Sequence, residues 1–200
     1  TLWHTLSLHD ALPISMSSGR CLIVEPGAKV TFNSLTNSGG TLKFLEDATG
    51  SASVIISNFY SDSGNEKFEM YLTGGGGPDY KWHYIAVPAQ IDKTTFTDIN
   101  QYNLLAWDES EIVDDDMQGW QWHDSHNGTN GFASLVTKKG YNFYHTSDNV
   151  TVELSPASSL VTSLGTINLQ WTEDGKNLLG NSLTCSIDWD EVTATGNVRN

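Results

Sequence analysis

Basic residues and cysteines are scarce in this chain, and a long apolar run is missing. Lysine and arginine together number 10 against 24 acidic residues, which gives a formal net charge of −14. Nucleic-acid binding needs clustered lysines and arginines, so this balance argues against a nucleic-acid partner. It equally disfavours an anionic membrane surface. No stretch approaches the roughly 20 apolar residues of a membrane-spanning helix, so we expect no membrane insertion.

The familiar catalytic signatures are also missing. The chain has no G-x-S-x-G elbow, and its GGGG run lacks the Lys-Ser/Thr of a phosphate-binding loop. The only cysteines, Cys21 and Cys185, have no activating neighbours in sequence. Whether they form a disulfide or stay two separate thiols is left open. We therefore expect a protein that is not an enzyme.

What is abundant points to β-structure. The chain holds 18 glycines and seven each of tryptophan, tyrosine and phenylalanine. Short Thr/Val/Ile/aromatic runs alternate with Gly, Asn, Asp and Ser, which is typical of strands and turns. The pattern predicts an all-β fold: a β-sandwich, jelly-roll-like, preceded by a short β-roll or a stack of hairpins.

The run TGGGGPD is the predicted boundary between two regions. Residues 16–75 are expected to form the N-terminal strand stack, and residues 76–200 the β-sandwich. In EKFEMYL, alternation places Phe68, Met70 and Leu72 on one buried face. KWHYIAVPAQ is predicted to be a strand buried on both faces, and TINLQWT and KNLLGN to be further strands.

An acidic stretch, DESEIVDDD, suggests a calcium site. Calcium prefers six to eight hard oxygen ligands, which acidic loops can supply. The candidate ligands are Asp108, Glu109, Asp114, Asp115 and Asp116. Their spacing does not fit an EF-hand loop, so a solvated acidic loop without any cofactor is the alternative. His123 and His126 do not complete a zinc site, and we expect them at the surface.

Trp120 and Trp122 are the candidate ligand-binding residues. They lie two apart on an expected strand, so both project from the same face. If exposed, the pair would form a platform for sugar rings, and if buried, it would belong to the sandwich core. The sequence leaves both interpretations open.

Three segments resemble a known family. The β-module of large cell-surface proteins exported by the type IX secretion pathway is similar to KGYNFYHTSDNVTVEL, GKNLLGNSLTCSIDWDEV and WHYIAVP. The family's pattern reads GKGY, GWNLIGNPYPSAIDWD and WhyiSsP. Upstream, the run LIVEPGAKVTF, NSGGTLKF and ATGSASVI resembles the strand stack that precedes this module in the family. The resemblance covers about residues 21–200. Ser182-Leu183-Thr184 stand where the family has Pro-Tyr-Pro, and Lys176 stands where it has Trp. It implies an extracellular β-rich module, cut off here at its C-terminal end, with no established catalytic residues.

The first fifteen residues, TLWHTLSLHDALPIS, do not fit this pattern. The sequencing-adapter DNA ACTCTTTCCCTACACGACGCTCTTCCGATC translates to TLSLHDALPI, which is identical to residues 5–14. We therefore expect residues 1–15 to be adapter-derived, from a metagenomic fragment, and to lie outside the fold. His9 and Asp10 resemble a catalytic pair, but on this interpretation they have no function.

The leading functional expectation is a structural or adhesive module of a secreted or cell-surface protein. Its partners would be glycans or other surface proteins, and its oligomeric state is not predicted. A carbohydrate-binding module is the first alternative, and an accessory domain of a secreted enzyme is the second.

Overall fold

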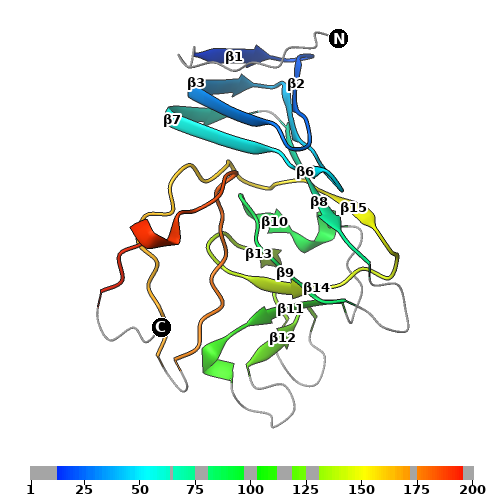
Figure 1. Ribbon diagram of the computed structural model, residues 1–200, viewed down its shortest axis with the longest axis vertical. Coiled ribbons are helices and arrows are strands. Elements are labelled where there is room, and N and C mark those ends of the chain that lie inside the picture. Colours follow the sequence, from blue (N-terminus) through cyan, green and yellow to red (C-terminus); the bar gives the residue numbers. More distant parts are fainter. Residues whose placement is uncertain are drawn as a thin grey trace.

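The fold was examined in a computed structural model that describes residues 13–63, 65–74, 81–96, 103–111, 119–124, 131–171 and 175–195 (Figure 1). The described part is all-β, and its several sheets are arranged in a sandwich-like way, which confirms the predicted fold class. No helix in these ranges is long and apolar enough to cross a bilayer.

The N-terminal half is a parallel β-roll, in which successive strands alternate between two sheets. The strands are β1 (Ile14–Ser17), β2 (Cys21–Val24), β3 (Lys29–Ser38), β4 (Thr41–Phe44), β7 (Ser53–Asp62) and β8 (Asn65–Leu72). One sheet has the order β1-β3-β7, and the other contains β2, β4 and β8. All of these pairings are parallel, so of the two predicted arrangements the roll is right and the hairpin stack is wrong. Within the roll, a short hairpin joins β5 (Glu46–Asp47) to β6 (Gly50–Ser51).

Alternating side chains hold the two roll sheets together. Phe32, Leu35 and Val54 are buried from one sheet, and Leu42 and Phe44 from the other. Phe44 stacks on Phe68 of the next strand, with ring centroids 4.7 Å apart and planes 10° from parallel. Alternate residues point outward, and a bulge between Phe32 and Ser34 interrupts this period of two, which lets both Phe32 and Leu35 face inward.

The C-terminal half contains a four-stranded antiparallel sheet of order β12-β11-β14-β9. Its strands are β9 (His83–Ile85), β11 (Leu104–Trp107), β12 (Trp120–Trp122) and β14 (Tyr141–Phe143). A two-stranded sheet pairs β10 (Ile91–Asp92) with β13 (Ser134–Leu135). Single 3-10 turns are η1 (Lys93–Thr95), η2 (Glu109–Glu111) and η4 (Trp189–Glu191).

Segments of the C-terminal half also pair with β7 and β8, the last strands of the roll. β15 (Val150–Leu154) pairs antiparallel with β8, although it comes from the other side of the predicted boundary. On the opposite roll sheet, Thr184 bonds the free edge of β7: its carbonyl accepts from Val54 N at 2.7 Å, and its hydroxyl donates to Val54 O at 2.7 Å. Terminal strands of a stacked roll need such covering, because their edges would otherwise be unpaired.

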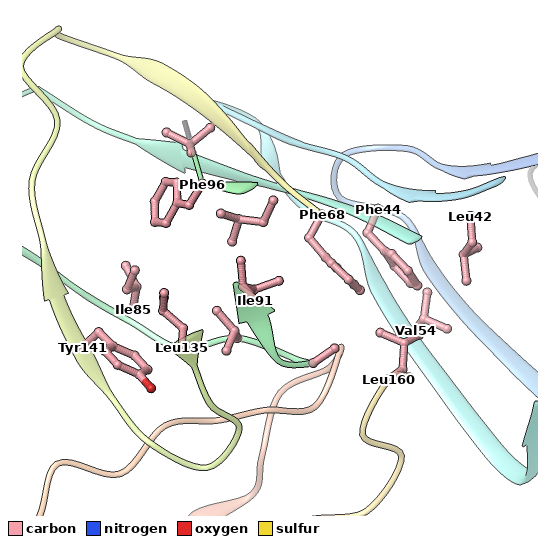
Figure 2. Packing of buried hydrophobic residues seen from close by; sticks show 14 of the residues in the cluster. Leu42, Phe44, Val54, Phe68, Ile85, Ile91, Phe96, Leu135, Tyr141 and Leu160 are labelled. Carbon is pink, nitrogen blue, oxygen red and sulfur yellow. The ribbon is translucent and has the colours of Figure 1, made fainter. Parts of the chain in front are cut away.

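One hydrophobic core therefore runs through both halves. Figure 2 shows it passing from Leu42 and Val54 in the roll, by way of Phe68, to Ile91 and Tyr141. Leu160 lies beside Val54 and comes from a segment with no regular structure.

Two sequence predictions about strands need correction. TINLQWT and KNLLGN form no strand over the described residues there, and the second makes only an isolated bridge between Leu179 and Lys139. The strand in KWHYIAVPAQ is buried on one face only, because Tyr84 is 73% and Trp82 is 42% exposed. An alternating apolar run does not reveal that one face of its sheet is left uncovered.

The end of the expected adapter segment also needs correction. Ile14 and Ser15, which we placed outside the fold, are the first two residues of β1 and pair with Leu35 and Thr36. Ile14 packs against the core. Strand pairing uses backbone groups, so almost any residue with an apolar side chain on the inner face can take part. Residues 1–12, including His9 and Asp10, lie outside the described ranges.

The three segments that carry the family resemblance meet at one place. Gly140 N donates to Leu178 O at 2.9 Å, and Gly180 N donates to Lys138 O at 3.2 Å. A side chain at Gly180 would lie 2.4 Å from Lys139 O and 2.7 Å from Ala86 Cβ. The two glycines therefore allow the segments to pack at backbone contact distance.

Candidate functional site

The outward side of the sheet β12-β11-β14-β9 carries the candidate site. Register places Tyr84, Asn142, Leu105 and Trp122 in one row across the four strands, and Trp107 beside Trp120 in the next. Residues two apart on a strand share a face. We call the six rings on this side the aromatic face. They are Trp82, Tyr84, Trp107, Trp120, Trp122 and Tyr144.

The rings of the aromatic face contact one another across the sheet. Tyr84 and Trp120 lie on the two outer strands, whose backbones are about 14 Å apart at about 4.8 Å per strand. Their ring centroids are only 6.5 Å apart, with planes 18° from parallel. The two side chains therefore lean toward each other over the middle strands, where Leu105 is buried.

Two edge-to-face contacts involve three of the remaining rings. Trp107 meets Trp120 at 5.3 Å and 85°, and its Nε1 donates to Lys176 O at 2.8 Å. Trp82 meets Tyr144 at 4.6 Å and 78°. Such pairs add about 0.5–1.5 kcal/mol beyond area burial, so they restrain the orientation of these rings.

The predicted platform pair, Trp120 and Trp122, belongs to this face but is only half-exposed. The most exposed rings, Tyr84 and Trp82, come from β9 and the residue before it. Sequence reasoning missed both, because it assigned them to a fully buried strand. The sequence pattern that could have identified Trp82 and Tyr84 is two large aromatic residues at positions i and i+2. The same pattern identified Trp120 and Trp122.

The opposite side of the same sheet faces the core. Leu104, Ala106, Tyr141 and Phe143 are buried there, and Tyr141 donates its hydroxyl toward Val136 O while accepting from Val136 N at 2.6 Å. Burial raises the pKa of Tyr141 to about 12. This packed underside makes the aromatic face a rigid surface.

The structure describes two of the five candidate calcium ligands. Asp108 Oδ1 accepts from Ser110 N at 3.0 Å and from Ser110 Oγ at 2.6 Å. Glu109 is buried, and its Oε1 accepts from Gly175 N at 2.6 Å. Asp114, Asp115 and Asp116 lie outside the described residues. Within the described ranges, no three Asp, Glu, His or Cys side chains form a metal-binding group, and a calcium site stays a prediction.

His123, Lys139 and the two cysteines lie in different environments. His123, expected at the surface, is buried, and its backbone carbonyl accepts from Lys93 Nζ at 2.8 Å. Burial lowers the pKa of Lys139, while the nearby charge of Asp108 opposes that shift. Cys21 is exposed and Cys185 half-buried, and neither forms a disulfide.

A buried polar cluster around Glu66 lies at the corner between β7 and β8. The buried Glu66 carboxylate accepts from Tyr60 OH at 2.7 Å and from Asn37 Nδ2 at 3.4 Å. Burial, a hydrogen bond with Asp62 and its charge raise the pKa of Glu66 to about 7. Asn37 also binds Gly40 N through Oδ1 at 2.9 Å, so the cluster links neighbouring turns of the roll.

In comparisons with known proteins, the chain matches no family model, no curated protein and no solved structure.

Proposed function

We propose that this chain is a non-catalytic, β-rich module of a secreted or cell-surface protein, and that it acts by attachment. The observation that carries the proposal is the aromatic face. Large rings that remain exposed on a well-packed sheet are typical of interaction surfaces, because burying them on a partner is favourable.

Rigidity makes this face suited to adhesion. Its rings stand on paired strands above a packed core, and Trp82 and Trp120 are each held by a neighbouring ring. A preorganised surface loses little conformational entropy on binding, so more of the contact energy remains as affinity. The β-roll beneath it, with its continuous core, would act as the spacer that carries the face.

The test is adhesion of the full chain coupled to beads. Beads would be washed over glass coated with polysaccharide, with protein, or with whole bacterial cells. We expect retention on at least one coating, and we expect Tyr84→Ala to reduce it strongly, because Tyr84 is the most exposed ring. Trp189→Ala is the matched control, since Trp189 is 63% exposed but lies on η4, away from the sheet. Beads that adhere to no coating better than blocked beads would contradict the proposal.

A further inference from the structure

We propose that the aromatic face binds an uncharged polysaccharide whose sugar rings stack on Tyr84 and Trp82. In this arrangement the ring of Trp120 supports Tyr84. The inference rests on the proposed attachment function and names its ligand class. Three properties of the face carry it: its charge, its width and the chemistry at the margins of its rings.

The face itself is uncharged. The six rings, together with Asn142 and Leu105 between them, include no ionisable group that is charged at neutral pH. Among the described residues next to these rings in sequence, Lys81 precedes Trp82 and Asp108 follows Trp107, so the margin carries both signs of charge. The net charge of −14 would also repel an anionic polymer. A neutral ligand therefore fits best.

The face is narrow. Four strands span about 14 Å, and the rings of Tyr84 and Trp120 converge over the middle of that width. A stable protein partner usually buries about 800 Å² on each side, with a polar and charged rim. The width of the aromatic face is closer to that of a single extended polymer chain.

The ring margins supply hydrogen-bonding groups beside the apolar faces. A pyranose ring presents C–H groups on its flat faces and hydroxyls at its edge. Stacking on a tyrosine or tryptophan buries the apolar face, and the Tyr84 hydroxyl and the Trp82 Nε1 can then bond the edge hydroxyls. Tyr84 is 73% and Trp82 is 42% exposed, so both can be reached from solvent.

The experiment is affinity electrophoresis and calorimetry of the full chain. The neutral probes are hydroxyethylcellulose, xyloglucan, galactomannan, laminarin and amylopectin, and the charged probes are alginate and chitosan. We expect at least one neutral polysaccharide to bind, with affinity that changes little between 50 and 500 mM salt, because no ion pair is involved. Tyr84→Ala should weaken binding at least about tenfold, Trp82→Ala should weaken it as well, and Trp189→Ala should leave it unchanged.

Several outcomes would overturn the inference. They are binding to none of the neutral probes, binding only to a charged one, and neutral binding that survives both the Tyr84→Ala and the Trp82→Ala change. Tyr84→Ala and Trp82→Ala each remove one ring pair, a loss of about 0.5–1.5 kcal/mol that should lower the melting temperature by only a few degrees. Tyr84→Phe separates stacking from the hydroxyl bond. If beads still adhere to protein-coated glass through Tyr84 while every polysaccharide fails, attachment stands and the ligand class is wrong. If neither assay shows binding, both proposals fail.

Discussion

Glu66 is an acid in an almost closed environment, only 6% exposed at a corner of the roll. Its carboxyl meets Tyr60, Asn37 and Asp62, and no lysine or arginine is among the groups that determine its pKa. Two carboxyls in hydrogen-bond contact cannot both stay charged at low cost. The corner is therefore most stable when Glu66 keeps its proton.

The pH dependence of Glu66 follows from its raised pKa. A folded pKa of about 7, against about 4.5 unfolded, means that its stabilisation is complete below pH 4.5 and lost as pH rises through 7. Glu66→Gln cannot ionise, so the unfolding free energy of this variant should exceed wild type increasingly from pH 4.5 to 8. The difference should grow by on the order of 1–3 kcal/mol, measured by urea titration at several pH values.

Glu153 provides the control of opposite sign. It bonds Lys67 and Lys43 on the outer surface of the roll, and the hydrogen bond from Lys67 is the main reason that its pKa is lowered. A lowered pKa contributes stability that is lost as pH falls. Glu153→Gln should cost about 0.2–1 kcal/mol near pH 7, and the cost should vanish in acid. If Glu66→Gln showed this same acid-side dependence, the account of Glu66 would be wrong.

The centre of the roll is its most sensitive region. Leu42 is fully buried on β4, so Leu42→Ala should lower the unfolding free energy by about 2–5 kcal/mol through the cavity it leaves. Ile23 on the neighbouring strand β2 points outward and is 46% exposed. Ile23→Ala should cost less than about 1 kcal/mol, and equal losses at the two positions would contradict the assigned inner face of the roll.

At the scale of elements, alternation predicts which side chains share a face but not which face is covered. For β8 it placed Phe68 and Leu72 correctly in the core. For β9 the same alternation is present, yet one side has no covering layer, and Tyr84 became the most exposed ring of the candidate site. Which face is covered depends on contacts between residues distant in sequence, such as Leu160 beside Val54. Sequence periodicity cannot predict those long-range contacts.

The pairing of segments 138–140 and 178–180 was equally hidden. Gly140 and Gly180 both lie in segments that carry the resemblance. Only the structure shows that Gly140 pairs with Leu178 and Gly180 with Lys138, on either side of the bridge between Lys139 and Leu179. Whether the chain belongs to the type IX secretion family stays a prediction. The glycines have a packing reason that does not depend on that membership.

Gly180→Ala tests this element. Its Cβ would lie 2.4 Å from the Lys139 carbonyl oxygen, which is backbone and cannot rotate away. The variant should lose about 1–3 kcal/mol of unfolding free energy, as overpacked sites do, measured by thermal and urea unfolding. Leu179→Ala, at a neighbouring and partly exposed position, should cost less. A Gly180→Ala protein as stable as wild type would show that the segment packs more loosely than described.

At the scale of the whole molecule, two architectures share one interior. The parallel roll and the antiparallel aromatic sheet differ in topology, but their buried residues form a single cluster. Val152 and Leu154 of β15 belong to this cluster, and Thr184 forms hydrogen bonds with the edge of the other roll sheet. Each half buries apolar side chains against the other, so either half alone would expose part of its core. Cooperative unfolding follows from this sharing.

The distribution of tryptophan allows that cooperativity to be measured. Trp82, Trp107, Trp120 and Trp122 lie in or beside the aromatic sheet, and the roll from residue 13 to 72 contains no tryptophan. In a Trp3→Phe background, fluorescence reports on the C-terminal half, while circular dichroism near 218 nm reports on the strands of both halves. We expect the two urea transitions to coincide, and Leu42→Ala in the roll to move the fluorescence midpoint as far as the dichroism midpoint. A fluorescence transition that does not respond to Leu42→Ala would mean that the halves unfold independently and that the shared core does not couple them.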